Sequence, residues 1–202
     1  MRKFTALKTI AAATLAAALL AGCGGATLAP KGALAVGTGY SVSLSRDWSD
    51  ISPLYYSRAK KVKILSIDGP GLNRLFVSEG LSAADPLMVH PTKGDNKNAP
   101  APRGKANMSY SEQIEFVTNS LAALDYQKVE ASAPKPVDLN GQRAVRFDIT
   151  AKTSEGLLLR GVAQAASKGG LGYYIVYIAP AEHYYDASLK DVLATMDSAK
   201  LP

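Results

Sequence analysis

The second half of the chain alternates apolar segments with turn signals, and this pattern constrains the fold more than any other feature. Asn140-Gly141 is a strong hairpin signal because both residues tolerate positive φ. Residues 145–150 then alternate apolar and polar side chains, which is typical of a strand with one buried face. Glycine-containing turns precede two further apolar runs, at 157–165 and 171–179. We therefore expect three consecutive antiparallel strands.

The first half predicts more strands of the same kind. Tyr40, Val42 and Leu44 alternate with serines and lead into Trp48, which we expect to close an edge of the core. Two further strands are expected over 61–67 and 72–80. The residues between them, Asp68-Gly69-Pro70-Gly71, are turn formers, so these two strands should form a hairpin.

Two amphipathic helices are expected beside these strands. Ser109-Tyr110-Ser111-Glu112 has the spacing of a capping box, which marks a helix start. Apolar residues follow at helical spacing in this segment, and again after Pro180. Strands in hairpin succession with two helices predict an α+β fold, a mainly antiparallel sheet with helices packed against it. The residues expected on the two apolar faces are Ile114, Val117, Leu121 and Leu124, then Tyr185, Leu189, Val192 and Met196.

Several of these segments together resemble the Mog1/PsbP-like fold, an α/β/α sandwich. The resemblance covers residues 39–202 and implies a small accessory or binding protein without catalytic activity. It rests on the opening Tyr-x-Val-x-Leu-x-x-x-Trp, the helix after a long loop, the hairpin at 137–141, Gly-Leu-Leu-Leu-Arg-Gly at 156–161 and Tyr177-Ile178-Ala179-Pro180 before the last helix.

The N-terminus predicts export and lipidation. A short basic region precedes an apolar stretch over 10–20, which is too short for a comfortable membrane span, and Leu20-Ala21-Gly22-Cys23 follows. This segment resembles a bacterial lipoprotein signal, residues 1–22, which implies lipid on Cys23 and cleavage before it. The alternative is an ordinary secretory signal followed by an incidental free cysteine. Gly24 after the cysteine implies, by the same resemblance, an outer-membrane protein that faces the periplasm.

Two segments are expected to lie outside the regular structure. Residues 23–38 are small and rich in glycine, so we predict a flexible tether between the lipid and a single domain over 39–202. Residues 85–107 combine proline, glycine, asparagine and charged residues, which predicts a long exposed loop. The sequence leaves open whether that loop has a function.

The net charge does not predict a nucleic-acid partner. The chain carries 23 basic and 17 acidic residues, but Arg2, Lys3 and Lys8 lie in the signal, which leaves about +3 on the mature part. Cys23 is the single cysteine, so neither a disulfide within the chain nor a cysteine metal site is expected. No cofactor is predicted. The expected partners are the membrane, through the N-terminal lipid, and an envelope protein.

The densest polar cluster on regular structure supplies the first candidate binding surface. Asp68, Asn73 and Arg74 could converge at one end of the predicted hairpin. The alternative is a turn in which Asp and Asn side chains bond their own backbone. Lys60, Lys61 and Lys63 could meet anionic lipid or phosphate, but alternation with Val62 and Ile64 favours a solvated strand face.

Tyrosines supply the second candidate surface. The chain has 10 of them, and their amphipathic rings are favoured at binding surfaces. Tyr173 and Tyr177 could line a groove between the last strand and the last helix. They share a strand face with Ile175, however, so packing beneath the helix would use them equally well.

No catalytic motif is visible. His90 and His183 have no partners at the spacing of a metal site or a triad, and we expect surface histidines and no enzyme activity. The leading hypothesis is a lipid-anchored envelope protein with a binding or scaffolding domain. The alternatives are a hydrolase of envelope polymers with dispersed carboxylates, and a carrier of small molecules or lipid.

Overall fold

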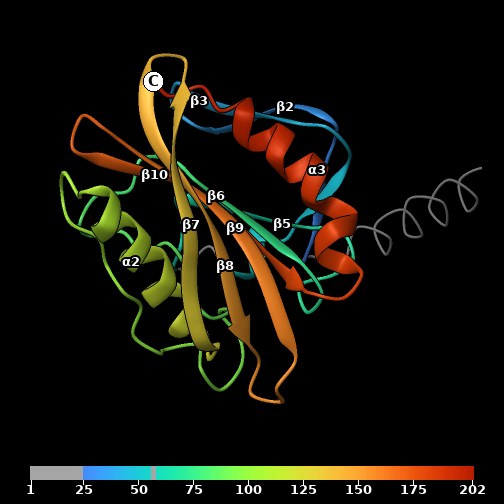
Figure 1. Ribbon diagram of the computed structural model, residues 1–202. Coiled ribbons are helices and arrows are strands. Elements are labelled where there is room, and N and C mark those ends of the chain that lie inside the picture. The colour runs from blue at the N-terminus through green and yellow to red at the C-terminus, as the bar shows by residue number, and fades with distance from the viewer. Residues whose placement is uncertain (1–24, 56–57) are drawn as a thin grey trace, which may run out of the picture.

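A computed structural model describes residues 25–55 and 58–202, and an antiparallel sheet of eight strands crosses its centre (Figure 1). The strand order is β1-β4-β5-β6-β10-β9-β8-β7, and β2 pairs with β3 in a separate two-stranded sheet. The α+β class with a mainly antiparallel sheet is confirmed. The strands are β1 Thr27–Ala29, β2 Gly32–Gly37, β3 Tyr40–Leu44, β4 Trp48–Asp50, β5 Val62–Ser66, β6 Arg74–Ser78, β7 Gln127–Leu139, β8 Gln142–Lys152, β9 Leu158–Lys168 and β10 Leu171–Pro180; the helices are η1 Ser52–Leu54, α2 Tyr110–Ala122 and α3 Tyr184–Asp197.

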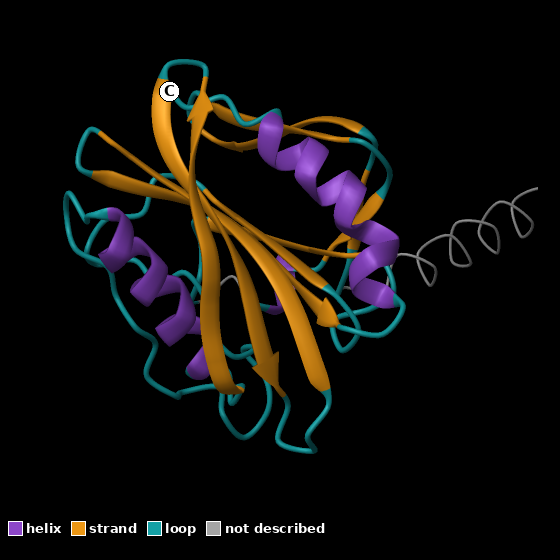
Figure 2. Cartoon of the chain, viewed as in Figure 1, coloured by secondary structure: helices purple, strands orange, loops and turns teal. Residues whose placement is uncertain are grey.

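The two longer helices cover opposite faces of the sheet (Figure 2). Alternate residues of β10 define those faces: Tyr174 and Val176 belong to the core that α2 covers, whereas Ile175 and Tyr177 belong to the core that α3 and the β2–β3 hairpin cover. Both faces of this central strand are therefore buried.

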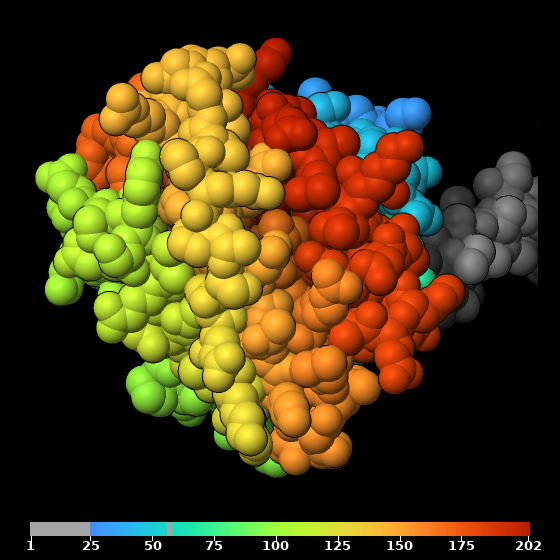
Figure 3. Space-filling model, in the orientation of Figure 1, coloured from blue at the N-terminus to red at the C-terminus, as the bar shows by residue number. Residues whose placement is uncertain are grey.

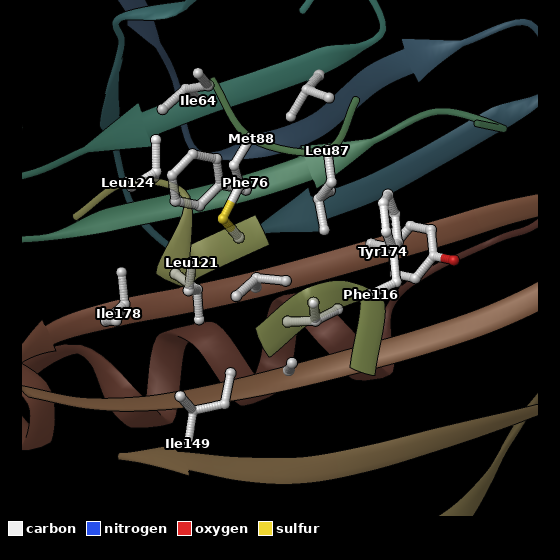
Figure 4. Packing of buried hydrophobic residues seen from close by; sticks show 14 of the residues in the cluster. Ile64, Phe76, Leu87, Met88, Phe116, Leu121, Leu124, Ile149, Tyr174 and Ile178 are labelled. Carbon is white, nitrogen blue, oxygen red and sulfur yellow. The ribbon is translucent and has the colours of Figure 1, made fainter. Parts of the chain in front are cut away.

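The α2 face is a packed hydrophobic core (Figure 4). Ser109 caps α2 as predicted: its hydroxyl accepts from the Glu112 amide at 3.3 Å, and the Glu112 carboxylate accepts from the Ser109 amide at 2.9 Å. Phe116 and Leu121 then point from the helix into the core, where the Phe116 ring meets the Tyr174 ring edge to face with 5.4 Å between the ring centroids.

The predicted hairpins are confirmed. β7 and β8 join at Asn140 and Gly141, whose φ values are 54° and 85°. β5 and β6 pair from Val62 with Ser78 to Leu65 with Leu75, so the turn at 67–73 lies at one end of that hairpin. β8, β9 and β10 form the expected meander.

β7 is an exposed edge strand that runs between the two helices over the surface (Figure 3). Its pairing with β8 shifts register twice, and Pro134 and Pro136 lie within it. Bulges and prolines interrupt the row of backbone donors that an edge strand would otherwise offer to another chain. This edge is therefore poorly suited to pairing with a further strand.

The flexible tether predicted over 23–38 is wrong for residues 27–37, which form β1 and β2. β1 extends the main sheet beside β4, and β2 pairs with β3. Leu34 and Val36 are half-buried in the α3 core, whereas Ala33 and Ala35 face solvent. The alternation was present in the sequence, but the small size of the alanines and glycines concealed it. The domain therefore includes residues 27–37 of the predicted tether.

The exposed loop predicted over 85–107 is also wrong in part. Leu87, Met88 and Val89 are buried in the α2 core, and Met88 lies beside Phe76 (Figure 4). Residues 93–98 are exposed, as expected. Three consecutive apolar residues suffice to hold this segment on the sheet because the area they bury outweighs the polar composition around them.

The predicted signal peptide and the lipidation site at Cys23 lie outside the described residues. Within the described part of the chain, no helix has the length and apolar character needed to cross a membrane.

Candidate functional site

The turn between β5 and β6 places the first predicted cluster at one end of the sheet. Asn73 is buried, and its Oδ1 accepts from the Ser66 hydroxyl at 3.0 Å and the Ile67 amide at 2.8 Å. Its Nδ2 donates to the Asp68 carboxylate at 2.6 Å. Asp68 and Asn73 thus converge, but they are engaged in holding the turn. The turn-stabilising alternative describes these two residues best.

Arg74 does not join that pair, because its side chain lies on the α2 face of the sheet. The guanidinium donates to the Tyr126 hydroxyl and lies 5.5 Å from the centre of the Tyr126 ring and 5.8 Å from that of Phe76. Tyr55, which is buried, also interacts with the guanidinium and favours its charged form. Aromatic rings and hydroxyls therefore surround this cation.

Arg74 has no acidic partner in the part of the chain that the structure describes, where no Asp or Glu forms an ion pair with it. Burial lowers the pKa of the guanidinium from its ordinary value, and the interaction with Tyr55 opposes that shift. Arginine nevertheless stays charged in proteins, so the described residues hold a partly buried cation and no counter-charge for it.

A small cavity lies beside this cation. Its volume is about 10 Å³, which is room for one water-sized atom. We call Arg74, Tyr55, Tyr126 and this cavity the Arg74 site. The cavity is lined by Pro70, Gly71, Leu72, Asn73, Arg74, Tyr126, Leu159, Ile178, Ala179 and Pro180.

Two exposed leucines come directly before a cavity residue in the chain. Leu157 and Leu158 precede Leu159, and 46% and 48% of their surface is exposed. The Leu158 carbonyl accepts from the Ala181 amide at 2.9 Å, which fixes this turn against the end of β10. Because side chains alternate along β9, Leu158 lies on the α3 face of the sheet, whereas Leu159 lies on the α2 face with Arg74. The Arg74 site thus has a cation beside its cavity and one exposed leucine, Leu157, two residues before the lining residue Leu159.

The sequence did not point to the tyrosines of this site. Tyr126 follows the end of α2, and Tyr55 follows η1, so the two rings reach Arg74 from segments far apart in the chain. Neither lies in a motif of fixed spacing. A basic residue at the first position of a strand whose later residues are buried was the one available signal.

The groove proposed for Tyr173 and Tyr177 is wrong, and packing in the core is the correct alternative. They are 7% and 0% exposed. Tyr173 meets the Tyr40 ring at 5.3 Å, and Tyr177 stacks on Tyr185 of α3 at 5.9 Å. Burial raises the pKa of Tyr177 to about 12, and its hydroxyl donates to the Tyr184 carbonyl at 2.9 Å. On β9, Ala166 lies opposite Tyr173 and Val162 lies opposite Tyr177.

The two histidines lie apart from each other. His90 Nε2 is 3.0 Å from the Ala123 carbonyl, and His183 precedes α3 in a backbone conformation with φ 67° and ψ −59°. The Tyr184 amide donates to the Glu182 carbonyl at 2.8 Å, which makes a strained γ-turn centred on His183. Within residues 25–55 and 58–202, no group of three His, Cys, Asp or Glu side chains is close enough to hold a metal ion.

Comparison with known proteins places the fold in the PsbP-like class. No family model matches the sequence, and no curated protein does. Among solved structures, the solution structure of cyanobacterial PsbP (CyanoP) from Synechocystis sp. PCC 6803 is similar, with a TM-score of 0.52 and 10% identity over 90% of this chain and 95% of that one. LpqN of Mycobacterium tuberculosis, described as involved in cell envelope biogenesis, matches with a TM-score of 0.34 and 12% identity over 89% of this chain and 87% of that one. The first likeness confirms the fold expected from the sequence.

Proposed function

We propose that this chain is a lipoprotein of the cell envelope, anchored through lipid on Cys23, whose domain binds a partner without catalysing a reaction. The lipobox Leu20-Ala21-Gly22-Cys23 supports the anchor, and Gly24 supports an outer-membrane location facing the periplasm. The partner is an envelope protein that presents a carboxylate to Arg74.

The single observation that carries the binding function is the partly buried Arg74 guanidinium, which has no acidic partner among the described residues. Buried charges in proteins are normally paired because desolvation disfavours the charged form. The cavity beside Arg74 has room for one oxygen atom, which in the free protein a water can supply. A carboxylate oxygen from a partner fits the same volume and adds the missing counter-charge.

The apolar residues around the cavity support a protein partner. Leu72, Leu159 and Ile178 line it with Arg74, and the exposed Leu157 precedes Leu159 by two residues. Protein interfaces characteristically place apolar contacts around a buried arginine or aromatic anchor, and such anchors contribute most of the binding energy. An acidic side chain between apolar neighbours on the partner would complement this arrangement.

Site-specific photo-cross-linking in cells tests this function. A cross-linking residue at Leu157 should capture a protein, and replacement of Arg74 by Met should abolish the adduct. Leu28, which is 69% exposed on β1, provides the matched control position, where the Arg74 change should have no effect. The partner peptide should contain an acidic residue whose replacement also abolishes the adduct. An adduct at Leu157 that persists with Arg74→Met would refute the site.

Mass spectrometry of the purified protein tests the anchor separately. The mature N-terminus should be Cys23 with acyl chains attached, and Cys23→Ser should leave an unprocessed, unlipidated precursor. Normal maturation and membrane recovery of that variant would refute the lipid anchor.

A further inference from the structure

A second cationic region lies at the opposite end of the β5–β6 hairpin. Lys61 directly precedes β5, whereas the Arg74 site lies beyond its other end. An open cleft of about 230 Å³ there is lined by four basic side chains and one acidic side chain. We call it the basic cleft. Its lining residues are Arg58, Lys60, Lys61 and Arg103, with Asp85, Ala59, Ala84 and Pro86.

The cleft has a defined shape. The Arg58 guanidinium donates to the Lys97 and Ala99 carbonyls, which ties the segment before β5 to the segment after Val89. Lys61 pairs with Asp85 at 2.8 Å. Lys60 and Arg103 are exposed. The side chains of Arg58 and Lys61 are thus held in place, whereas those of Lys60 and Arg103 face solvent.

The cleft lies close to the point where the chain leaves for its N-terminus. The Leu54 side chain is 3.8 Å from the position that a Cβ atom would take on Gly25. The Leu54 carbonyl accepts from the Thr92 amide at 2.7 Å, and the segment that begins at Thr92 reaches Arg58 at Lys97. Residues around Leu54 therefore connect Gly25 to the cleft through direct contacts.

The distance to the anchor follows from chain length. Cys23 is two residues before Gly25, and two residues of extended chain span at most about 7 Å. Because the tether predicted from sequence is largely folded, lipid on Cys23 would hold the surface around Leu54 against the bilayer. A cationic cleft beside that surface would then meet the lipid head groups.

We propose that the basic cleft binds the phosphate-bearing head groups of anionic phospholipids and thereby fixes the orientation of the anchored domain. This inference rests on the proposed lipid anchor. Juxtamembrane basic residues are attracted to anionic surfaces by about fivefold in binding constant for each Lys or Arg. With the cleft on the membrane, the Arg74 site at the other end of the hairpin faces away from it and stays open to a partner.

Hydrogen exchange of the reconstituted protein tests the cleft. The lipidated full-length mature chain is placed in phosphatidylcholine vesicles with and without phosphatidylglycerol, and exchange is followed in peptides that cover 58–61 and 97–103. Phosphatidylglycerol should slow exchange there, and Lys60→Glu with Arg103→Glu should lower that protection by on the order of tenfold or more. Lys135→Glu with Lys152→Glu, exposed positions on β7 and β8, is the matched control and should leave it unchanged.

The outcomes separate the cleft from the anchor. Equal protection in the cleft variant and the wild type would overturn the cleft while leaving the anchor intact. Slow exchange in phosphatidylcholine after addition of inorganic phosphate would show a free-anion site and overturn the lipid assignment. If mass spectrometry shows no acyl chain on Cys23, the anchor is overturned. In that case, co-sedimentation with phosphatidylglycerol vesicles measures lipid binding by the cleft. Equal co-sedimentation of the wild type and the cleft variant would overturn the cleft proposal.

Discussion

Arg74 lies among aromatic rings at one end of the β5–β6 hairpin, whereas the cations of the basic cleft lie in or near solvent at the other. The first is a single, partly desolvated charge that has no acidic partner among the described residues. The second is a group of charges, one of them already paired with Asp85. A desolvated charge interacts strongly over a short range, and an exposed group attracts over a longer range that salt screens. The first arrangement suits recognition of one group, and the second suits a charged surface.

The two ends of the β5–β6 hairpin also differ in the interactions that stabilise them. At the Arg74 end, the buried amide of Asn73 joins Ser66, Ile67 and Asp68. At the cleft, the fixed ion pair between Lys61 and Asp85 is 38% and 22% exposed in its two side chains. A buried hydrogen bond is costly to break because the group left behind has no water to bond instead. Surface ion pairs, by contrast, contribute little to the free energy of unfolding. Substitutions at the two ends should therefore have unequal effects on stability.

The largest expected effect is that of Asn73→Ala. This change leaves the buried Ser66 hydroxyl and the Ile67 amide without their acceptor, and we expect a loss of about 2–4 kcal/mol in the free energy of unfolding. Urea unfolding of the purified chain measures it. Asn96→Ala, which removes an exposed hydrogen bond to Asp125, is the control and should cost under ~0.5 kcal/mol. Equal losses of unfolding free energy in the two variants would mean that the hydrogen bonds of Asn73 stabilise the protein no more than a surface contact does.

The next prediction compares two arginines on the same sheet. Arg146 on β8 donates to Gln164 Oε1 at 3.1 and 2.5 Å and to Asp197 at 2.6 Å. Arg146→Met leaves the buried Gln164 oxygen without its donor, so we expect a loss of about 1–3 kcal/mol in unfolding free energy. Arg74→Met removes an unpaired charge and should change stability by less than ~1 kcal/mol. The midpoints of urea unfolding measure this difference in stability between the two variants.

A large loss for Arg74→Met would change the interpretation of the Arg74 site. It would show that the contacts with Tyr55 and Tyr126 are needed for folding, and that a structural role accounts for the residue. Retained stability together with a lost cross-link at Leu157 would identify Arg74 as a residue kept for binding, because function often retains a residue at no gain in stability.

Local patterns in the sequence predicted the hairpins and the helices. The capping box at Ser109 and the Asn140-Gly141 turn are formed by residues a few positions apart, so their geometry is encoded in the segment itself. The strands over 27–37 were missed because alanine and glycine carry little apolar contrast, and pairing with β3 and β4 gives them their structure.

The site was less predictable because it depends on contacts between distant segments. Arg74 lies at a hairpin end, as expected, but its side chain does not join Asp68 and Asn73, and its neighbours Tyr55 and Tyr126 reach it through the tertiary fold. The tyrosines of β10 were ambiguous for a physical reason: the same amphipathic ring suits a core and a groove. Tyr173 and Tyr177 are buried beneath β3 and α3, so they belong to the core.

The smallest expected effect concerns pH and the cleft. Burial acts to raise the pKa of Asp85, but hydrogen bonds from Lys61 and Ser82 and the charge of Lys61 outweigh it, so the pKa lies below its ordinary value. A carboxyl group whose pKa is lowered in the folded state stabilises the protein above its unfolded pKa, and that contribution is lost as the pH falls below about 4. Asp85→Asn should therefore cost about 0.5–1 kcal/mol at neutral pH and nothing at low pH. Asp95→Asn, exposed on the same segment, is the control and should match the wild type at both pH values. Urea unfolding at both pH values measures these differences.

A loss for Asp85→Asn as large as that for Asn73→Ala would mean that the interactions at the cleft stabilise the protein as much as those at the Arg74 end, and the contrast between the two regions would disappear.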